Sequence, residues 1–196
     1  MASRTQPEIT RQQIILALAA LASHPNKPEH GPLGRLAGLH LPGINLRGLN
    51  LNHIDFTGSY LRGADFRGAS LQGTVFAECN LQDADFRDAY AESCEEGIKL
   101  DLTRADLSGA NLNGVGLSGA SAEQAKFHGA DLRGTNFIDA HLPYATFTAA
   151  RISGTHFVNC VMSRYALDDA FAEGDPIIES VRWWGDEVEA ESLAVG

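Results

Sequence analysis

The segment from Ile54 to Asp88 reads IDFTGSYLRGADFRGASLQGTVFAECNLQDADFRD, and a large apolar residue returns in it at every fifth position. We call these positions centres, and in this segment they are Phe56, Leu61, Phe66, Leu71, Phe76, Leu81 and Phe86. A small residue such as Ser59 or Ala64 stands two positions before most centres. A period of five fits neither an α-helix nor a flat strand. The backbone must therefore return to the same orientation every five residues, which indicates a repeat architecture.

The same spacing extends from Leu36 to Leu167, with an interruption between Phe86 and Leu102. Glycine is common two residues after the centre, as at Gly58. A type II turn needs a positive φ at its third residue, and glycine adopts that φ without steric cost. Each pentapeptide is thus predicted to be a short extended stretch followed by a tight turn. Two of its five side chains, one large and one small, point inward.

The pattern A-(D/N)-L-x-G recurs in this chain as ADFRG at 64–68, ADLSG at 105–109 and ADLRG at 130–134. It resembles the pentapeptide repeat family. The resemblance implies an all-β solenoid, a right-handed quadrilateral β-helix with four pentapeptides in each coil. On the length of the repeat region we expect about seven coils. The family is functionally mixed, so the resemblance implies a fold and leaves the function open.

Four pentapeptides per coil place centres twenty residues apart on top of one another. Phenylalanine pairs are then predicted to stack, namely Phe56 on Phe76, Phe66 on Phe86, Phe127 on Phe147, and Phe137 on Phe157. A break is expected near residues 91–101, where the motif is lost. Three pentapeptide strides plus one extra residue would keep phenylalanine on the same walls, and we favour this solution. One stride plus a longer loop is the alternative.

Residues 1–32 are predicted to be an N-terminal capping helix followed by a Pro-rich linker. The helix spans about Thr10 to Ser23, and Thr10 with Gln13 forms a capping box at its start. Covering the first coil is the expected role, because an open β-helix end exposes core and unpaired backbone. The first coil has large residues where others have small ones, at Leu39, Ile44, Leu49 and Ile54. The alternative is that residues 1–22 act as a signal peptide.

Residues 33–170 form the predicted β-helix, and residues 171–196 a C-terminal helix with an acidic tail. Asp175 and Pro176 resemble a helix N-cap and first turn, so the helix is expected from Pro176 to Trp184. It should cap the last coil and leave one Trp partly exposed. We therefore expect that two copies pair through this end by a two-fold axis. The predicted cap and dimer contacts are Ile177, Val181, Trp183 and Trp184.

Composition narrows the functional classes. The net charge of −10 makes direct nucleic-acid binding an unfavourable hypothesis. Three cysteines argue against a disulfide framework and favour a reducing, cytoplasmic compartment, with export as the alternative if residues 1–22 are a signal. No apolar run is long enough to cross a membrane. No sequence pattern predicts a catalytic, cofactor or metal site, so we expect a protein that is not an enzyme and needs no cofactor.

One segment combines acidity with loss of the repeat. Its candidate partner-binding residues are Glu78, Asp83, Asp85, Asp88, Glu92, Glu95, Glu96 and Asp101. They form either a solubilising face or a binding surface that attracts a basic protein. The sequence therefore predicts a protein-interaction module whose partner is unknown. The family resemblance implies an alternative, since its fluoroquinolone-resistance members are acidic β-helices that bind DNA gyrase in place of DNA.

Overall fold

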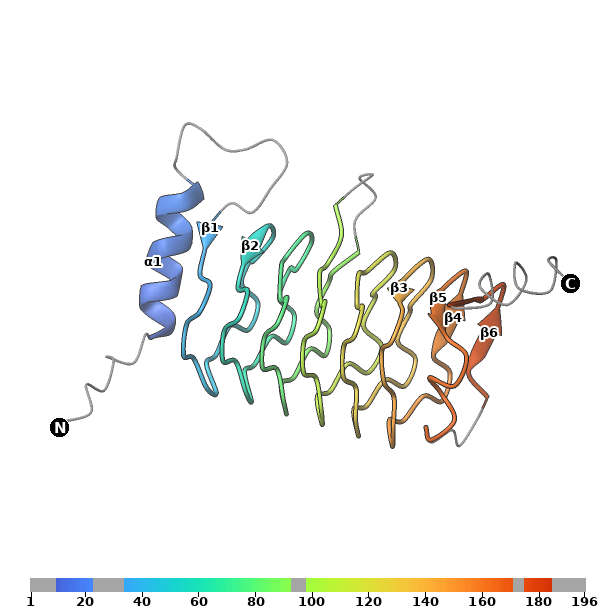
Figure 1. Cartoon of the computed structure of the whole chain (residues 1–196). Coiled ribbons are helices and arrows are strands. Elements are labelled where there is room, and N and C mark those ends of the chain that lie inside the picture. The colour runs from blue at the N-terminus through green and yellow to red at the C-terminus, as the bar shows by residue number, and fades with distance from the viewer. Residues whose placement is uncertain (1–9, 23–33, 93–97, 171–174, 185–196) are drawn as a thin grey trace, which may run out of the picture.

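The computed structural model describes residues 10–22, 34–92, 98–170 and 175–184, and Figure 1 shows their arrangement as one helix beside a long stack of coils. The helix α1 spans Arg11–Ala22. The strands are short: β1 Gly34–Arg35, β2 Ile54–Asp55, β3 His141–Leu142, β4 His156–Val158, β5 Val161–Ser163, β6 Ile177–Glu179 and β7 Arg182–Trp184. All strand pairs are parallel. Most of the remaining stack is held by isolated parallel bridges.

These bridges run along four walls of the stack, and each bridging residue directly precedes a centre. Wall A passes through Asp55, Val75, Asp101, Ser121 and His141. Wall B passes through His40, Tyr60, Asn80, Asp106, Lys126 and Thr146. Wall C passes through Asn45, Asp65, Asp85, Asn111, Asp131 and Arg151. Wall D passes through Asn50, Ser70, Tyr90, Gly116, Asn136 and His156. The four-sided cross-section that the sequence predicts is therefore present.

The core consists of centres and the small residues that precede them. The four predicted phenylalanine stacks are confirmed, with ring centroids 5.4, 4.7, 5.0 and 5.4 Å apart. Rings on opposite walls also meet edge to face across the core, for example Phe66 of wall C and Phe76 of wall A at 5.2 Å. Buried hydroxyl and thiol groups are satisfied as well: Thr74 donates to the carbonyl of Leu51 at 2.9 Å. Among the described residues, no buried side-chain polar atom lacks a partner.

The break differs from the favoured prediction. Bridging partners are twenty residues apart before it, as in Asp55 and Val75, but Val75 pairs with Asp101. The extra residues follow Ala91, which occupies a centre position and is buried. Two strides and a six-residue insertion thus separate Phe86 from Leu102, instead of three strides and one residue. The prediction failed because it assumed that phenylalanine returns to the same walls after the break, and the alternative of one stride with a longer loop fails for the same reason.

As a consequence, the phenylalanine columns change walls at the insertion. Phe56 and Phe76 follow the bridging residues of wall A, whereas Phe127 follows Lys126 of wall B. The ladder continues across this change because leucine fills the equivalent places. Leu102 occupies wall A directly after Phe76 and is buried. Leucine and phenylalanine are therefore interchangeable at centres, and their alternation does not fix the number of strides.

The N-terminal helix is close to its predicted span. Its capping box is formed, since the Thr10 N–H donates to Gln13 Oε1 at 2.7 Å. Ile14 is 1% exposed and belongs to the same buried cluster as Leu41 and Leu46. Figure 1 shows α1 lying across the N-terminal end of the stack, beside β1. No helix in the described ranges is long and apolar enough to span a membrane.

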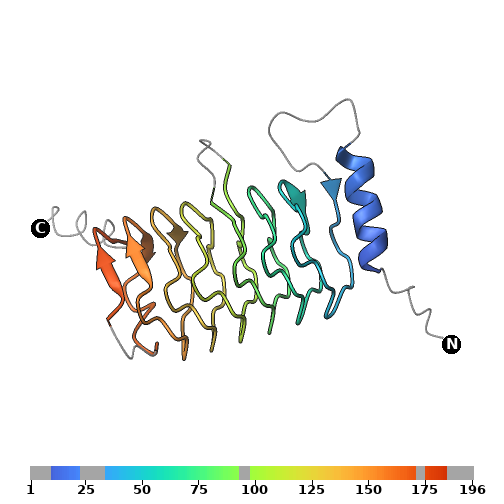
Figure 2. The same ribbon diagram turned by 180° about the vertical axis from the view of Figure 1, so that it is seen from behind.

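The predicted C-terminal helix is wrong, because its described residues form β6 and β7. Phe157 pairs with Ile178, and Met162 pairs with Trp183. Ile178 and Trp183 are five residues apart, so they continue the register of the centres, and Ser180 makes the intervening turn at a φ of 52°. β-Branched residues favour this extended backbone over a helix. Figure 2 shows both strands extending the stack at its C-terminal end.

Candidate interaction surfaces

The structure gives no catalytic or metal centre among its described residues, where no group of three His, Cys, Asp or Glu side chains lies close enough to hold a metal ion. Cys79 and Cys160 are buried, and burial raises the pKa of their thiols to about 12 and about 11. A thiol with a raised pKa is a poor nucleophile because its thiolate fraction is small. The outer walls and the two ends therefore hold the candidate sites.

The acidic residues predicted to bind a partner do not share one wall. Glu78, Asp83 and Asp88 occupy three successive corners with positive φ, while Asp85 and Asp101 lie on walls C and A. Glu95 and Glu96 lie outside the described residues.

Several of these acidic side chains are paired locally. Arg62 binds Asp83 at 3.0 Å and Arg104 binds Glu78 at 3.4 Å. Asp101 accepts the backbone N–H of Thr103 at 2.9 Å. The two arginine contacts offset the charges of Asp83 and Glu78, so the acidity of this segment is not presented as a continuous face.

Glu92 lies against wall D at the start of the insertion. Its Oε1 accepts hydrogen bonds from the Ser118 hydroxyl at 2.9 Å and the Asn136 amide at 3.2 Å. A Cβ on Gly116 would lie only 2.5 Å from that oxygen. Gly116 has no positive φ, unlike the corner glycines, so the space for Glu92 is what this glycine provides. The sequence hinted at this contact only through glycine at a position where other repeats carry a side chain.

A row of amides extends the same contact to earlier coils. Asn52 donates to Gln72 Oε1 at 3.2 Å, and Gln72 donates to the Glu92 carbonyl at 2.7 Å. On the other side of the insertion, the Ile98 side chain packs against Gly73, where an added Cβ would lie 3.0 Å from its Cγ2 atom. Both flanks of the insertion are thus fastened to the rod.

Wall C carries a repeated Asp-x-Arg arrangement. Arg67, Arg87 and Arg133 each bind the aspartate two residues earlier at 2.6 Å. The Arg67 side chain hydrogen-bonds Asp65 and lowers the pKa of that carboxyl to about 2. Arg87 and Arg133 likewise lower the pKa of Asp85 and Asp131. These pairs make wall C a ladder of alternating charges.

At the N-terminal end, Arg11 bridges α1 to the first coil on wall C. Its Nη1 donates to the Asn45 carbonyl at 2.8 Å, and its Nη2 donates to the Arg47 carbonyl at 2.9 Å. Nη1 also donates to Asn45 Oδ1. No sequence pattern predicted this contact of Arg11. Its position in the first turn of the helix was the single available signal.

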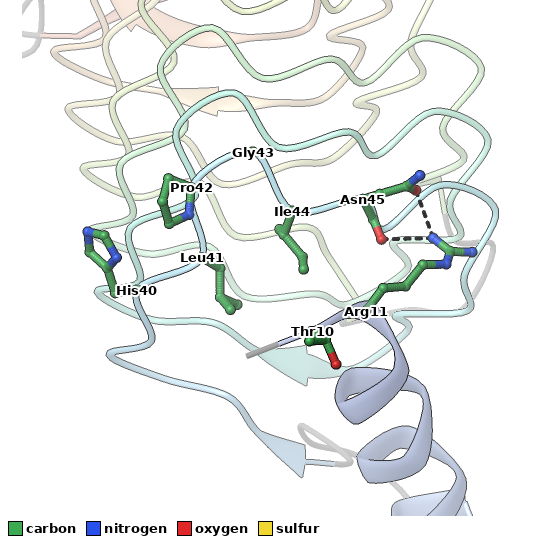
Figure 3. A pocket seen from close by; sticks show the side chains of 8 residues that line it. All are labelled: Thr10, Arg11, His40, Leu41, Pro42, Gly43, Ile44 and Asn45. Atoms are coloured by element: carbon green, nitrogen blue, oxygen red, sulfur yellow. Dashed lines mark hydrogen bonds between the residues drawn. The ribbon is translucent and has the colours of Figure 1, made fainter. Parts of the chain in front are cut away.

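A cleft of about 360 Å³ opens beside this contact (Figure 3). It lies between the start of α1 and the first coil, where His40, Leu41, Pro42 and Ile44 form the opposite side. The His40 ring stacks on Tyr60 with centroids 4.8 Å apart. Helix α1 therefore leaves this part of the end uncovered within the described chain.

At the C-terminal end, β6 and β7 are the outermost described rungs. Ile177 and Ile178 remain 39% and 44% exposed. Trp183 and Val181 are partly buried against the core, and the sequence likewise predicts a Trp183 that is only partly exposed. The Trp184 side chain lies outside the described part of the structure. A two-fold contact through this end stays a prediction, with Ile177 as its exposed apolar member.

Comparison with known proteins agrees with the fold. The family model described as Pentapeptide repeats matches residues 40–76, 59–94, 101–139 and 125–164. No curated protein sequence matches significantly. A trypsin-treated single-residue variant of QnrB1, a plasmid-mediated fluoroquinolone resistance protein, aligns with a TM-score of 0.53 at 21% identity over 83% of this chain and 81% of its own. HetL, involved in heterocyst differentiation regulation in the cyanobacterium Nostoc, aligns at 0.46 and 19% over 89% and 95%.

Proposed function

Because the chain belongs to the pentapeptide repeat family, we propose that it is a non-enzymatic interaction module whose rigid β-helix presents the acidic insertion region to a basic protein partner. The observation that carries this proposal is the insertion after Ala91, which interrupts an otherwise regular stack. Loops held by a rigid scaffold are frequent binding elements. Fastening by Glu92 and Ile98 supports such a role, because a fixed base lowers the ordering cost of binding.

Charge is expected to guide the encounter. Asp88 is exposed at a corner of the same coil, and the sequence places Glu95 and Glu96 within the insertion itself. Surface carboxylates attract a basic partner over about a Debye length, so binding should weaken as salt rises.

Affinity capture from the native lysate tests this function. The full chain is compared with Glu95→Gln/Glu96→Gln and with Asp168→Asn/Asp169→Asn, which removes the same charge at two exposed residues elsewhere. We expect one protein to be retained by the parent and the control pair, and lost from the insertion variant or at high salt. Equal retention by all three proteins, or by none, would reject the insertion as the binding site.

A DNA-mimicking binder of DNA gyrase is the second proposal, and it rests on the charge of −10 and the likeness to the fold of QnrB1. Phosphate mimicry needs rows of uncompensated carboxylates. On wall C, however, Asp65, Asp85 and Asp131 each have an arginine partner. A supercoiling assay at low salt and micromolar protein decides the point, since a gyrase binder must inhibit or protect the enzyme.

A further inference from the structure

The hydrogen bonds between coils follow a fixed pattern. The bridging residue donates back to the coil before it, as the Asp65 N–H does to the Ile44 carbonyl at 2.9 Å, and two other N–H groups of each pentapeptide donate to the coil after it. The N–H of a centre donates to the bridging residue's carbonyl one coil later, as Leu46 does to Asp65 at 2.8 Å. The corner residue donates in the same sense, as Gly48 does to Arg67 at 2.9 Å. The first coil has no coil before it in the described chain. Its bridging and following carbonyls therefore receive no N–H from a preceding coil.

Arg11 takes the place of that preceding coil on wall C. The carbonyls of Asn45 and Arg47 are the first-coil equivalents of those of Asp65 and Arg67. The two terminal nitrogens of the Arg11 guanidinium donate to them at 2.8 and 2.9 Å, close to the 2.8 and 2.9 Å of the backbone donors one coil later. The planar fork of arginine can satisfy two acceptors at once. Helix α1 therefore ends the parallel ladder by imitating its donors.

The C-terminal end is the complement of this edge. The N–H groups of Ile178 on β6 and Trp183 on β7 occupy the centre positions, whose equivalents in earlier coils donate to the next coil. No later coil follows in the described ranges, and β6 and β7 lie on walls D and A. A second copy placed coaxially would offer the carbonyls of Asn50 and Arg35 on those same walls.

Apolar surface and charge also match between the two ends. The first coil has Leu36, Leu39, Ile44 and Leu49 only partly buried, and the last has Ile177 and Ile178 exposed. Without α1, the first coil at residues 34–53 carries a net charge of +2 from Arg35 and Arg47, whereas residues 175–184 carry −1 from Asp175, Glu179 and Arg182. Opposite charges favour contact between unlike ends.

We propose that the two ends of the rod are complementary, so that the C-terminal edge of a second copy binds the N-terminal end when α1 leaves it, and that α1 with Arg11 is the cap that prevents this head-to-tail assembly. The contact is heterologous, so it propagates into open chains and does not close as a dimer. It involves one coil from each copy and is therefore weak and concentration-dependent.

The test uses full-length variants and sedimentation velocity over a range of concentrations. Arg11→Glu/Ile14→Asp removes the fork and places a charge at a buried contact, and we expect species that grow beyond dimers. Leu16→Asp is the matched control, since Leu16 lies on the same helix but is 60% exposed, and it should sediment as a single rod like the parent. The proposal is overturned if the control variant forms larger species. It is also overturned if the double variant keeps its circular dichroism spectrum and sediments only as single rods. If the double variant unfolds, Arg11→Ala alone replaces it and should assemble at higher concentration.

A second substitution tests the other edge. Ile178→Pro removes the N–H that would donate to the second copy, whereas Ile178→Ala keeps it. In the Arg11→Glu/Ile14→Asp background, the proline variant should return to single rods and the alanine variant should still assemble. Mixing the proline variant with the parent, whose C-terminal edge is intact, should give only a 1:1 complex. If the Ile178→Pro variant still assembles, the head-to-tail contact is wrong. A parent protein that already forms dimers through its C-terminal end would also contradict it.

Discussion

Cys79 and Cys160 act as hydrogen-bond donors within the core. Their thiols lie 3.0 and 2.8 Å from the carbonyls of Phe56 and Phe137, in the same relation as the Ser59 hydroxyl to the Leu36 carbonyl. We therefore expect Cys79→Ser to be nearly neutral, and Cys79→Ala to cost roughly 1 kcal/mol through the lost thiol hydrogen bond, since the Phe56 carbonyl keeps only the Ser59 N–H. Urea unfolding of both variants measures the difference. If the two variants have equal unfolding free energies, the hydrogen bond of Cys79 does not stabilise the fold.

The same thiols should be unreactive in the folded chain. Burial raises their pKa to about 12 and about 11, so little thiolate exists at pH 8. In a Cys94→Ser variant, a thiol reagent should modify neither cysteine until denaturant is added. Rapid modification of the native protein would show that the core opens readily.

The corner residues of the coils have positive φ, a conformation that is unfavourable for residues other than glycine. Gly58 has a φ of 67° and nothing within 4 Å of an added Cβ, so Gly58→Ala is penalised by backbone conformation alone. We expect a loss of about 1 kcal/mol, because the left-handed region costs L-residues roughly this much. Ala149, with a φ of 56°, is the reverse case, and Ala149→Gly should stabilise. Chemical denaturation of both variants checks the opposite signs.

Acid sensitivity follows from the carboxyls of wall C. The folded-state pKa of Asp65 lies at about 2, below its ordinary value of 3.8, because Arg67 hydrogen-bonds it. The unfolded chain therefore binds the proton more readily, so this stabilisation is complete above about pH 4 and is lost as pH falls toward 2. Urea midpoints should drop over that window, and less so in Arg67→Gln. A parallel drop in both proteins would exclude the pair as the cause.

At the scale of the element, the insertion depends on one contact. Gly116→Ala would put a methyl group where Glu92 lies, so either the bonds to Ser118 and Asn136 break or the backbone shifts. We expect a loss of roughly 1–2 kcal/mol. In a Glu92→Ala background the same change should cost far less. The resulting double-mutant cycle isolates this contact, and additive losses would contradict it.

The elements also show what could be predicted from the sequence. The five-residue spacing was enough to predict the stacked core, because a large apolar residue marks the inward-facing position of each pentapeptide. It was not enough for β6 and β7, since Ile177, Ile178 and Val181 fit a helical face as well as a strand. Long-range pairing of Ile178 with Phe157 decides between them. The contacts of Arg11 and Glu92 with distant carbonyls and amides left no local pattern to read.

At the scale of the whole molecule, the core behaves as a repeated unit whose positions can be exchanged. Phe137 is fully buried and stacks on Phe157. Phe137→Leu should be mild because leucine serves at other centres, whereas Phe137→Asp buries an unpaired charge and should prevent stable folding. Thermal melts of the two variants give the comparison, and an aspartate variant that melts like the parent would refute the assignment of this core.

The regular register predicts that the insertion can be removed without loss of the fold. Deleting residues 92–97 would place Leu102 five residues after Ala91, and every bridging pair that spans the insertion, such as Val75 and Asp101, would then lie twenty residues apart. The chain loses the bonds of Glu92 but gains an uninterrupted ladder. We therefore expect unchanged circular dichroism and a melting temperature within a few degrees of the parent. Closing a shorter connection costs less entropy, which offsets part of the lost contacts.

A deletion of the same length within the regular coils is the control. Removing residues 106–111 shifts all later centres by one position relative to the walls, so large side chains would point outward and the chain should not fold. If the 92–97 deletion also fails to fold, the insertion is part of the framework. If it folds and no longer retains the partner captured by the parent, the insertion serves binding and the coils serve only to hold it in place.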